Sequence, residues 1–164
     1  MARTHRYRIA LRWTGNTGTG TASYRGYSRD HELTAAGKSV IAGSSDPTFL
    51  GDPARWNPEE LLLASVAACH ELWYLGLCAA TGIMVTAYED NPEATMVEEA
   101  DGGGRFTAIL LRPHVTLANP ADQPQAAALH GEANAKCFIA NSLNLPVGHA
   151  PTFAVAAQTS QATE

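Results

Sequence analysis

The pattern of apolar and polar residues predicts strands near the start of the chain. Apolar and polar side chains alternate from Tyr7 to Trp13, which is the period of a half-buried strand. The glycine-rich segment 15–20 then predicts a turn, and Thr21–Tyr27 a second strand. With the short extended segments that follow, we expect an N-terminal sheet over about residues 6–42.

A helix over about residues 58–80 is strongly marked. Asn57 is a good N-cap, Pro58 suits the first helical position, and Glu60 can reach back to the backbone amide of Asn57. Apolar residues cover nearly all faces of this helix, so it should not lie on a surface with one side exposed to water. We expect a central helix whose apolar run is too short to span a membrane.

The second half of the chain predicts a further sheet and a second helix. Alternating segments predict antiparallel strands at residues 83–90, 94–99 and 106–117, which form a second sheet over about residues 83–118. A second helix is expected over about 123–143, and a final strand over about 152–158. Groups of strands separated by long helices indicate an α+β fold, and the length suits one domain over residues 1–164.

Composition restricts the partners and the compartment. The chain is 45% hydrophobic and 16% charged, which indicates a globular protein with a packed core. Its 11 Lys and Arg against 16 Asp and Glu give a net charge of −5, so no basic surface is expected to bind nucleic acid or an anionic membrane. Residues 1–13 lack the apolar region of a secretory signal, and we expect a cytoplasmic protein.

The three cysteines are Cys69, Cys78 and Cys137. In a reducing compartment, each must serve packing, metal binding or chemistry. Cys69 lies among large apolar side chains of the first helix, where the simple interpretation is packing as a small hydrophobe. Cys137 changes this view, because two packed helices could bring the thiols together as a redox pair. Cys78 is turned to another face and is interpreted as a packing residue.

A metal centre is not predicted. Cys69 and His70 are adjacent on a helix, so they lie about 100° apart and point away from each other. His31, His130 and His149 could join a site through the fold, but single histidines are more often surface or structural residues than ligands. We therefore expect neither a metal nor a cofactor.

Two motifs together carry a family resemblance. Asn57-Pro58-Glu59 begins a helix whose Cys69 follows ten residues after that glutamate, and the segment Cys137-Phe-Ile-Ala-Asn-Ser-Leu143 lies far downstream. This arrangement resembles the OsmC/Ohr family of osmotically inducible and organic-hydroperoxide-resistance proteins. The resemblance implies two antiparallel β-sheets around two long central helices, in an intertwined homodimer with active sites at the subunit interface.

The resemblance also implies a thiol peroxidase. The family's first-helix cysteine, matched by Cys69, attacks the peroxide and becomes a sulfenic acid. The second-helix cysteine, matched by Cys137, condenses with it to a redox-active disulfide, which a dithiol reductant such as a lipoyl protein reduces. Because an apolar pocket raises the pKa of a thiol, a positive charge must accompany a nucleophilic cysteine.

The family supplies that charge from an arginine oriented by a glutamate. The glutamate maps onto Glu59, for which a helix-dipole role in the first turn is the alternative. It lies about 15 Å from Cys69 along one helix, which suggests cooperation across a dimer or through a long arginine. Of Arg25 and Arg29 we prefer Arg29, in a predicted turn, although surface salt bridges are the alternative for both.

Through this resemblance, we expect a cytosolic, cofactor-free peroxidase that reduces organic hydroperoxides and takes part in the oxidative stress response. The apolar neighbours of Cys69 favour alkyl over hydrogen peroxide, since apolar burial contributes about 25 cal/mol per Å². The alternatives are a non-enzymatic redox sensor or small-ligand binder of the same fold, and a structural dimer whose cysteines only pack.

Overall fold

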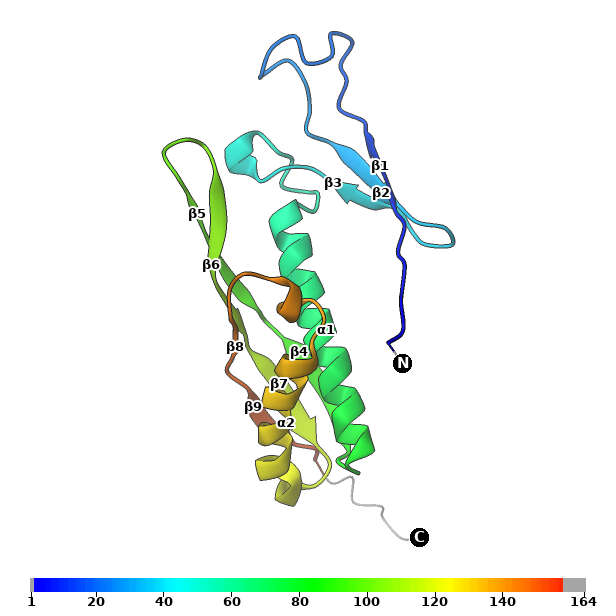
Figure 1. Cartoon of the computed structure of the whole chain (residues 1–164), viewed down its shortest axis with the longest axis vertical. Helices are drawn as coiled ribbons and strands as arrows, with labels where there is room; N and C mark the ends of the chain where they lie inside the picture. Colours follow the sequence, from blue (N-terminus) through cyan, green and yellow to red (C-terminus); the bar gives the residue numbers. More distant parts are fainter. Residues whose placement is uncertain (1, 158–164) are drawn as a thin grey trace. The chain divides into compact units, whose positions relative to one another are not determined.

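The computed structural model describes residues 2–157 and separates into two compact units (Figure 1). The first unit is Met1–Leu62 and the second is Leu63–Glu164. The boundary falls inside the long helix α1 (Pro58–Ala80), which contributes its first turn to one unit and the remainder to the other. The organisation of residues 1–164 as a single domain stays a prediction.

The first unit is built on an antiparallel sheet of three short strands in the order β1-β2-β3. The strands are β1 (Ala10–Trp13), β2 (His31–Thr34) and β3 (Ile41–Gly43), and the short 3-10 helix η1 (Pro47–Phe49) follows them. The strand expected at Thr21–Tyr27 is wrong, because these residues form turns and bends.

Side chains hold the loop between β1 and β2 in place of a strand ladder. The side-chain oxygen of Asn16 accepts a hydrogen bond from the amide of Gly18 at 2.9 Å. The guanidinium of Arg29 donates to the carbonyl oxygens of Tyr27 and Tyr24, both at 2.6 Å. Because these backbone groups are bonded locally, the segment needs no partner strand.

Helix α1 begins as the sequence predicts. The side-chain oxygen of Asn57 accepts from the amide of Glu60 at 2.7 Å, and Oε2 of Glu60 accepts from the amide of Asn57 at 3.1 Å, which confirms the capping box. The buried residues of the helix recur at every fourth position: Val66, His70, Tyr74 and Cys78. The expectation that no side of this helix is exposed to water is wrong for the single chain, because the side chain of Leu72 is 71% exposed.

The expectation that the apolar run of this helix is too short to span a membrane is wrong, because α1 is long and apolar enough, by length and composition, to cross one. The core helix of a soluble protein meets the same criteria, so this is weak evidence for a span. The buried stripe of α1 carries His70 and Tyr74, whose rings stack with a ring from the second helix. These contacts give α1 a packing role within its unit.

The second unit holds two further sheets of three strands each, in the orders β4-β7-β9 and β5-β6-β8. Their strands are β4 (Val85–Asp90), β5 (Glu93–Glu98), β6 (Gly104–Leu111), β7 (Pro113–Leu117), β8 (Val147–His149) and β9 (Thr152–Val155). The β4–β7 and β5–β6 pairs are antiparallel as expected, whereas β8 and β9 add parallel partners to β6 and β7. Residue 158, in the predicted final strand, lies outside the described residues.

The predicted strand that should have run through residues 106–117 is divided at Arg112. The amide of Arg112 donates to the side-chain Oδ1 of Asp90 on β4 at 2.8 Å instead of to a backbone carbonyl of a strand ladder. Pro113, the next residue, has no amide hydrogen to continue a ladder. The one expected sheet therefore becomes two.

Helix α2 (Gln123–Lys136) follows the short 3-10 helix η2 (Pro120–Asp122) and ends well before the predicted residue 143. The side-chain amide of Asn141 donates to the carbonyl oxygens of Ala135 and Cys137, each at 2.9 Å. These bonds satisfy carbonyls that a longer helix would use. Cys137 therefore caps α2 with an extended backbone instead of lying within it, and η3 (Ala140–Ser142) comes next.

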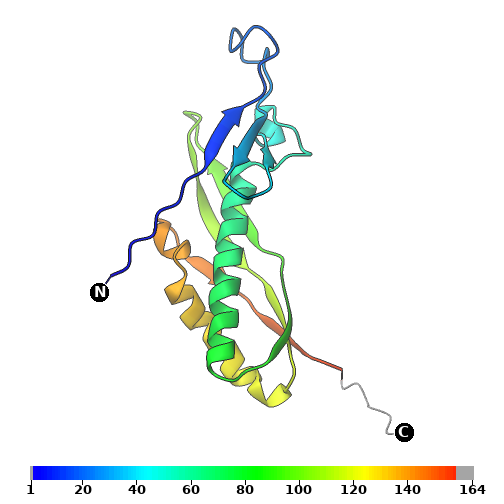
Figure 2. The same ribbon diagram turned by 90° about the vertical axis from the view of Figure 1, so that its right-hand side faces the viewer.

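Helices α1 and α2 pack side by side on the β4-β7-β9 sheet (Figures 1 and 2). The core between these layers consists of Tyr74, Cys78, Ile83, Val115, Leu117, Ala126, Leu129 and Ala133. A second core cluster joins α1 to the β5-β6-β8 sheet through Val66, Ile109, Leu111 and Val147. Sheets combined with two long helices confirm the α+β class.

Candidate functional site

The structure brings the thiols of Cys69 and Cys137 together within the second unit. The two side chains are in hydrogen-bonding contact, and both cysteines are free. Burial raises the pKa of Cys137, and the contact with Cys69 raises it further. The amide of Ala140 donates to the sulfur of Cys137 at 3.4 Å, which works in the opposite direction. The two sulfurs therefore share one site, as the redox-pair hypothesis requires.

Neighbouring residues of both cysteines hold this geometry. Val66 lies one turn before Cys69 and belongs to the second core cluster. Ile139 and Ala140, just after Cys137, pack against the same cluster. Because the residues around each thiol share one core, the distance between the two sulfurs depends on how α1 and the end of α2 pack together.

An aromatic pair lies beside the thiols. Trp73 stands one helical turn after Cys69 on α1 and meets Phe138, the residue after Cys137, edge to face with ring centroids 5.6 Å apart. Nζ of Lys136 lies 5.8 Å from the centre of the Trp73 ring. Phe138 is 71% exposed, so an apolar surface is open to solvent next to the sulfur pair in this chain.

The other two predicted site residues, Arg29 and Glu59, belong to the first unit. The guanidinium of Arg29 lies 4.4 Å from the centre of the Tyr24 ring and 4.2 Å from that of Tyr27. Among the described residues, no ion pair includes Arg29 or Glu59, and Oε2 of Glu59 is buried without a hydrogen-bond partner. Their catalytic roles stay predictions.

Sequence reasoning missed Arg55, a half-buried cation in the first unit. Its Nε lies 3.5 Å from a carboxylate oxygen of Asp30 and 3.6 Å from one of Asp52. With Trp56 and Glu60, it lines a cavity of about 320 Å³. Its position just before the helix cap is the signal that could have identified it. Arg55 therefore joins Arg29 as a candidate source of positive charge.

A cluster of three histidines was also missed as a cluster. Nε2 of His70 lies 3.0 Å from Nδ1 of His130, and the His149 ring lies 5.8 Å from that of His70 and 5.9 Å from that of His130. Burial, and then His149, lowers the pKa of His70 to about 4. Burial, and then His70 and His149, lowers that of His130 to about 3. Both rings are therefore neutral at pH 7.

The histidines do not form a metal centre. In the part of the chain that the structure describes, no group of three His, Cys, Asp or Glu side chains is arranged to hold a metal ion. His130 and His149 were recognised as residues that the fold could bring to a site, but the sequence did not reveal their meeting with His70. That meeting depends on the packing of α1 against α2.

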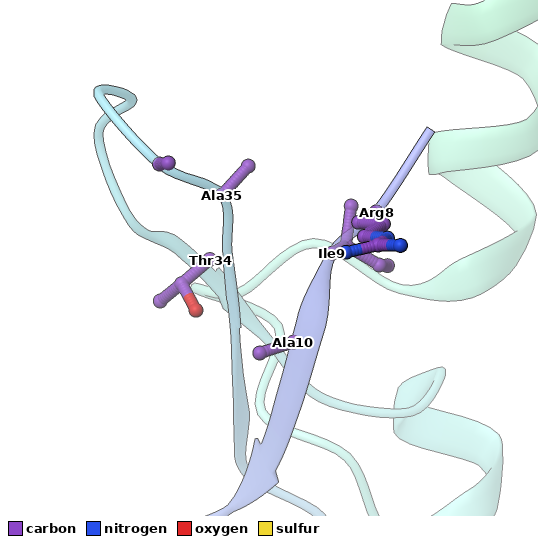
Figure 3. Close-up of a pocket in the computed structure, with 6 residues that line it drawn as sticks. Arg8, Ile9, Ala10, Thr34 and Ala35 are labelled. Atoms are coloured by element: carbon purple, nitrogen blue, oxygen red, sulfur yellow. The ribbon is translucent and has the colours of Figure 1, made fainter. Parts of the chain in front are cut away.

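Two further cavities have linings that include neither Cys69 nor Cys137. One, of about 340 Å³ in the second unit, is lined by Ala64, Ala67, Ala68, Glu71, Tyr88, Asp90 and Pro92. Burial raises the pKa of Asp90, and Glu71 adds to this. The other, of about 440 Å³, is a groove at the edge of the first sheet lined by Arg8, Ile9, Ala10, Thr34, Ala35 and Ala36 (Figure 3). Neither lining includes a cysteine.

Solved structures of the same fold cover almost the whole chain. An OsmC-like protein of unknown function from Vibrio cholerae is 26% identical, with 91% of this chain and 100% of that chain covered and a TM-score of 0.80. An organic hydroperoxide resistance protein from Elizabethkingia anophelis is 16% identical, with 93% and 100% covered and a TM-score of 0.66. The organic hydroperoxide resistance protein OhrB of Bacillus subtilis is 18% identical, with 89% and 98% covered and a TM-score of 0.60.

A match to a family model establishes which family the chain belongs to, and the shared fold agrees with it. None of the curated proteins matches the chain. The family model described as OsmC-like protein matches residues 51–149, which is more than half of the chain and includes both Cys69 and Cys137. The resemblance drawn from the two motifs is confirmed, and this chain belongs to the OsmC-like protein family.

Proposed function

We propose that the protein is a thiol-dependent peroxidase that reduces organic hydroperoxides. The observation that carries the proposal is the contact between the thiols of Cys69 and Cys137. Two solved structures of this fold bear the name organic hydroperoxide resistance protein, which supports the same chemistry. Cys69 is the attacking residue, because it is the less buried of the two and a peroxide must reach it from solvent.

The reaction has three steps. The Cys69 thiolate attacks the terminal oxygen of the hydroperoxide, the O–O bond breaks, and the alkoxide leaves as an alcohol after taking up a proton. Cys69 is thereby oxidised to a sulfenic acid. The Cys137 thiolate then attacks the Cys69 sulfur, so that an S–S bond forms and the hydroxyl group leaves as water. An external dithiol reduces the disulfide and is itself oxidised.

The surroundings of Cys137 affect the second step. Its pKa is raised by burial and by Cys69, so the thiol must lose a proton before it can attack. The amide of Ala140, which donates to this sulfur, stabilises the thiolate that forms. We expect disulfide closure to speed up as the pH rises, because the thiolate fraction of Cys137 increases.

The surface beside the thiols favours an apolar substrate. Trp73 and Phe138 present aromatic rings next to the sulfur pair, and Phe138 is exposed. An alkyl or fatty-acid chain can bury area against such side chains, at about 25 cal/mol per Å². Hydrogen peroxide has no apolar part to bind there, so organic hydroperoxides are the preferred class.

The remaining features of the proposal concern charge and assembly. A positive charge close to Cys69 is required to stabilise its thiolate, and Arg29 oriented by Glu59 is our candidate source. These residues act across an intertwined homodimer, in which a partner also covers the apolar side chains that α1 leaves exposed, such as Leu72. The protein works in the cytoplasm, where dithiol reductants such as lipoyl proteins are available.

The test is peroxide consumption by the full chain with dihydrolipoamide, thioredoxin or glutathione as the reductant. We expect turnover of alkyl hydroperoxides with at least one dithiol, and none with Cys69→Ser, because a serine hydroxyl is not ionised at neutral pH. Cys78→Ala is the matched control, since Cys78 is buried in a different core cluster and should leave turnover unchanged. Oxidation of the pair without turnover by any dithiol would favour a redox sensor.

A further inference from the structure

The hydrogen bond between His70 and His130 joins α1, which carries Cys69, to α2, whose C-terminus is capped by Cys137. His70 follows Cys69 directly on α1, and its Nε2 lies 3.0 Å from Nδ1 of His130 on α2. His130 is seven residues before Cys137, about 10 Å along the helix. The same two segments are therefore joined once through the histidines and once at the sulfurs.

The histidine pair is buried and its geometry is fixed on several sides. The two rings are nearly parallel, at 5°, and the Tyr74 ring stacks on that of His130 with centroids 3.9 Å apart. The His149 ring completes the surroundings from β8. Nδ1 of His70 and Nε2 of His130 have no hydrogen-bond partner among residues 2–157, so the bond between the two rings is the side-chain hydrogen bond that each of them makes there.

The hydrogen bond between His70 and His130 is directional, so it can fix the register of α1 against α2. The α2 residues of this core are Ala126, Leu129 and Ala133, whose apolar contacts are non-directional and do not by themselves select one register. Moving one helix by a single residue shifts it about 1.5 Å. A disulfide forms only within a narrow range of Cα separations, so a shift of this size changes whether the sulfurs can bond. A buried polar pair is a known way to fix such a register.

We propose that the hydrogen bond between His70 and His130 sets the register of α1 against α2, and thereby the efficiency with which Cys137 captures the oxidised Cys69. The two histidines are positioning residues, because they act through the helices and touch no reacting atom. The idea rests on the proposed function for its biological meaning. The register itself can be measured without any peroxide.

The test compares two polar substitutions at one position. His130→Asn places an amide group where Nδ1 stands, so it can still bond to Nε2 of His70. His130→Gln has a similar polarity, but its amide lies where Nε2 stands and cannot make that bond in the same register. Ile83→Ala is the control for general destabilisation, because Ile83 belongs to the same core but not to the histidine pair.

Each full-length variant is treated with an alkyl hydroperoxide, and mass spectrometry measures the ratio of Cys69–Cys137 disulfide to Cys69 sulfinic acid. We expect His130→Gln to lower this ratio about tenfold, equivalent to about 1.4 kcal/mol. His130→Asn and Ile83→Ala should stay near the wild-type ratio. The rate of the first oxidation of Cys69 should be the same in all four proteins.

A second arm uses diamide, which forms the disulfide without a peroxide. The same order of variants is expected in the rate of disulfide formation. Wild-type closure with diamide but no reaction with hydroperoxides would reject the proposed function and leave the register proposal standing. Equal closure by His130→Gln and His130→Asn, or an equal loss in Ile83→Ala, would overturn the register proposal itself.

Discussion

The thiol of Cys137 is hydrogen-bonded to the thiol of Cys69 although the two residues belong to different helical segments. Burial and this contact both raise the pKa of Cys137. A buried, protonated thiol is a poor first nucleophile but is well placed to close a disulfide once its neighbour is oxidised. We therefore expect Cys69 to react first and Cys137 to close the disulfide, which simple packing of the two thiols would not predict.

Replacing the second thiol should leave the first oxidation intact. In Cys137→Ser, Cys69 reacts with one hydroperoxide to give a sulfenic acid, which has no partner thiol and is oxidised by a second hydroperoxide to sulfinic acid. Mass spectrometry should show two added oxygens on Cys69 and no catalytic turnover with a dithiol. If Cys69 stays unmodified after prolonged exposure to peroxide, the assignment of Cys69 as the attacking residue is wrong.

The charge that activates Cys69 can be located with two arginines of the same loop. Arg29→Met should slow oxidation of Cys69 about tenfold, the effect of losing about 1.4 kcal/mol of thiolate stabilisation. Stopped-flow mixing of the reduced protein with an alkyl hydroperoxide measures this rate. Arg25→Met should have no effect, because Arg25 is exposed.

The bonds from Arg29 to the carbonyls of Tyr24 and Tyr27 require a further control. Arg29→Lys keeps a positive charge but cannot reproduce both bonds in the same planar geometry. A normal oxidation rate in Arg29→Lys, with a slow one in Arg29→Met, would support the charge itself. If neither variant slows oxidation, Arg55 becomes the candidate.

The start of α1 should depend on its reciprocal cap. Asn57→Ala removes the acceptor for the Glu60 amide and should cost about 1 kcal/mol of unfolding free energy. Urea unfolding followed by circular dichroism measures the loss. Glu60→Gln should cost less, because glutamine can also accept from the Asn57 amide in a capping box. Equal losses in the two variants would show that the charge of Glu60 matters beyond the cap.

The sequence predicts correctly those parts of the fold that are determined by residues close together in the chain. The cap at Asn57 and Glu60 places α1 correctly, since both partners of each hydrogen bond lie within one turn. The two cysteine motifs identify the family, and the fold brings Cys69 and Cys137 together. These inferences need only residue types and their spacing along the chain.

The errors arise where a single side-chain hydrogen bond decides the backbone, or where segments far apart in the sequence pack together. Asn141 ends α2 by bonding to carbonyls of the last turn, although the residues in between are compatible with a helix. Asp90 accepts from the amide of Arg112 and helps to divide a predicted strand. The meeting of His70 with His130 has the same origin, because it exists only after α1 and α2 have packed.

The histidine pair also predicts how stability depends on pH. In the folded chain, burial and neighbouring histidines lower the pKa of His70 to about 4 and that of His130 to about 3. In the unfolded chain both return to about 6.5, so the unfolded state binds more protons between these values. The stability that the two histidines contribute by being buried in their neutral form is therefore fully present above about pH 6.5. It is lost as the pH falls towards 4.

Urea unfolding of the wild type and of His130→Asn between pH 7 and pH 5 measures this loss. Each buried imidazole adds up to about 1.4 kcal/mol per pH unit to the slope, and the variant lacks one of them. The wild type should therefore lose stability more steeply than His130→Asn as the pH is lowered. His5→Asn should match the wild type, because His5 is exposed and lies outside the buried histidine pair. Parallel curves for the wild type and His130→Asn would mean that His130 takes up a proton in the folded chain as readily as in the unfolded one.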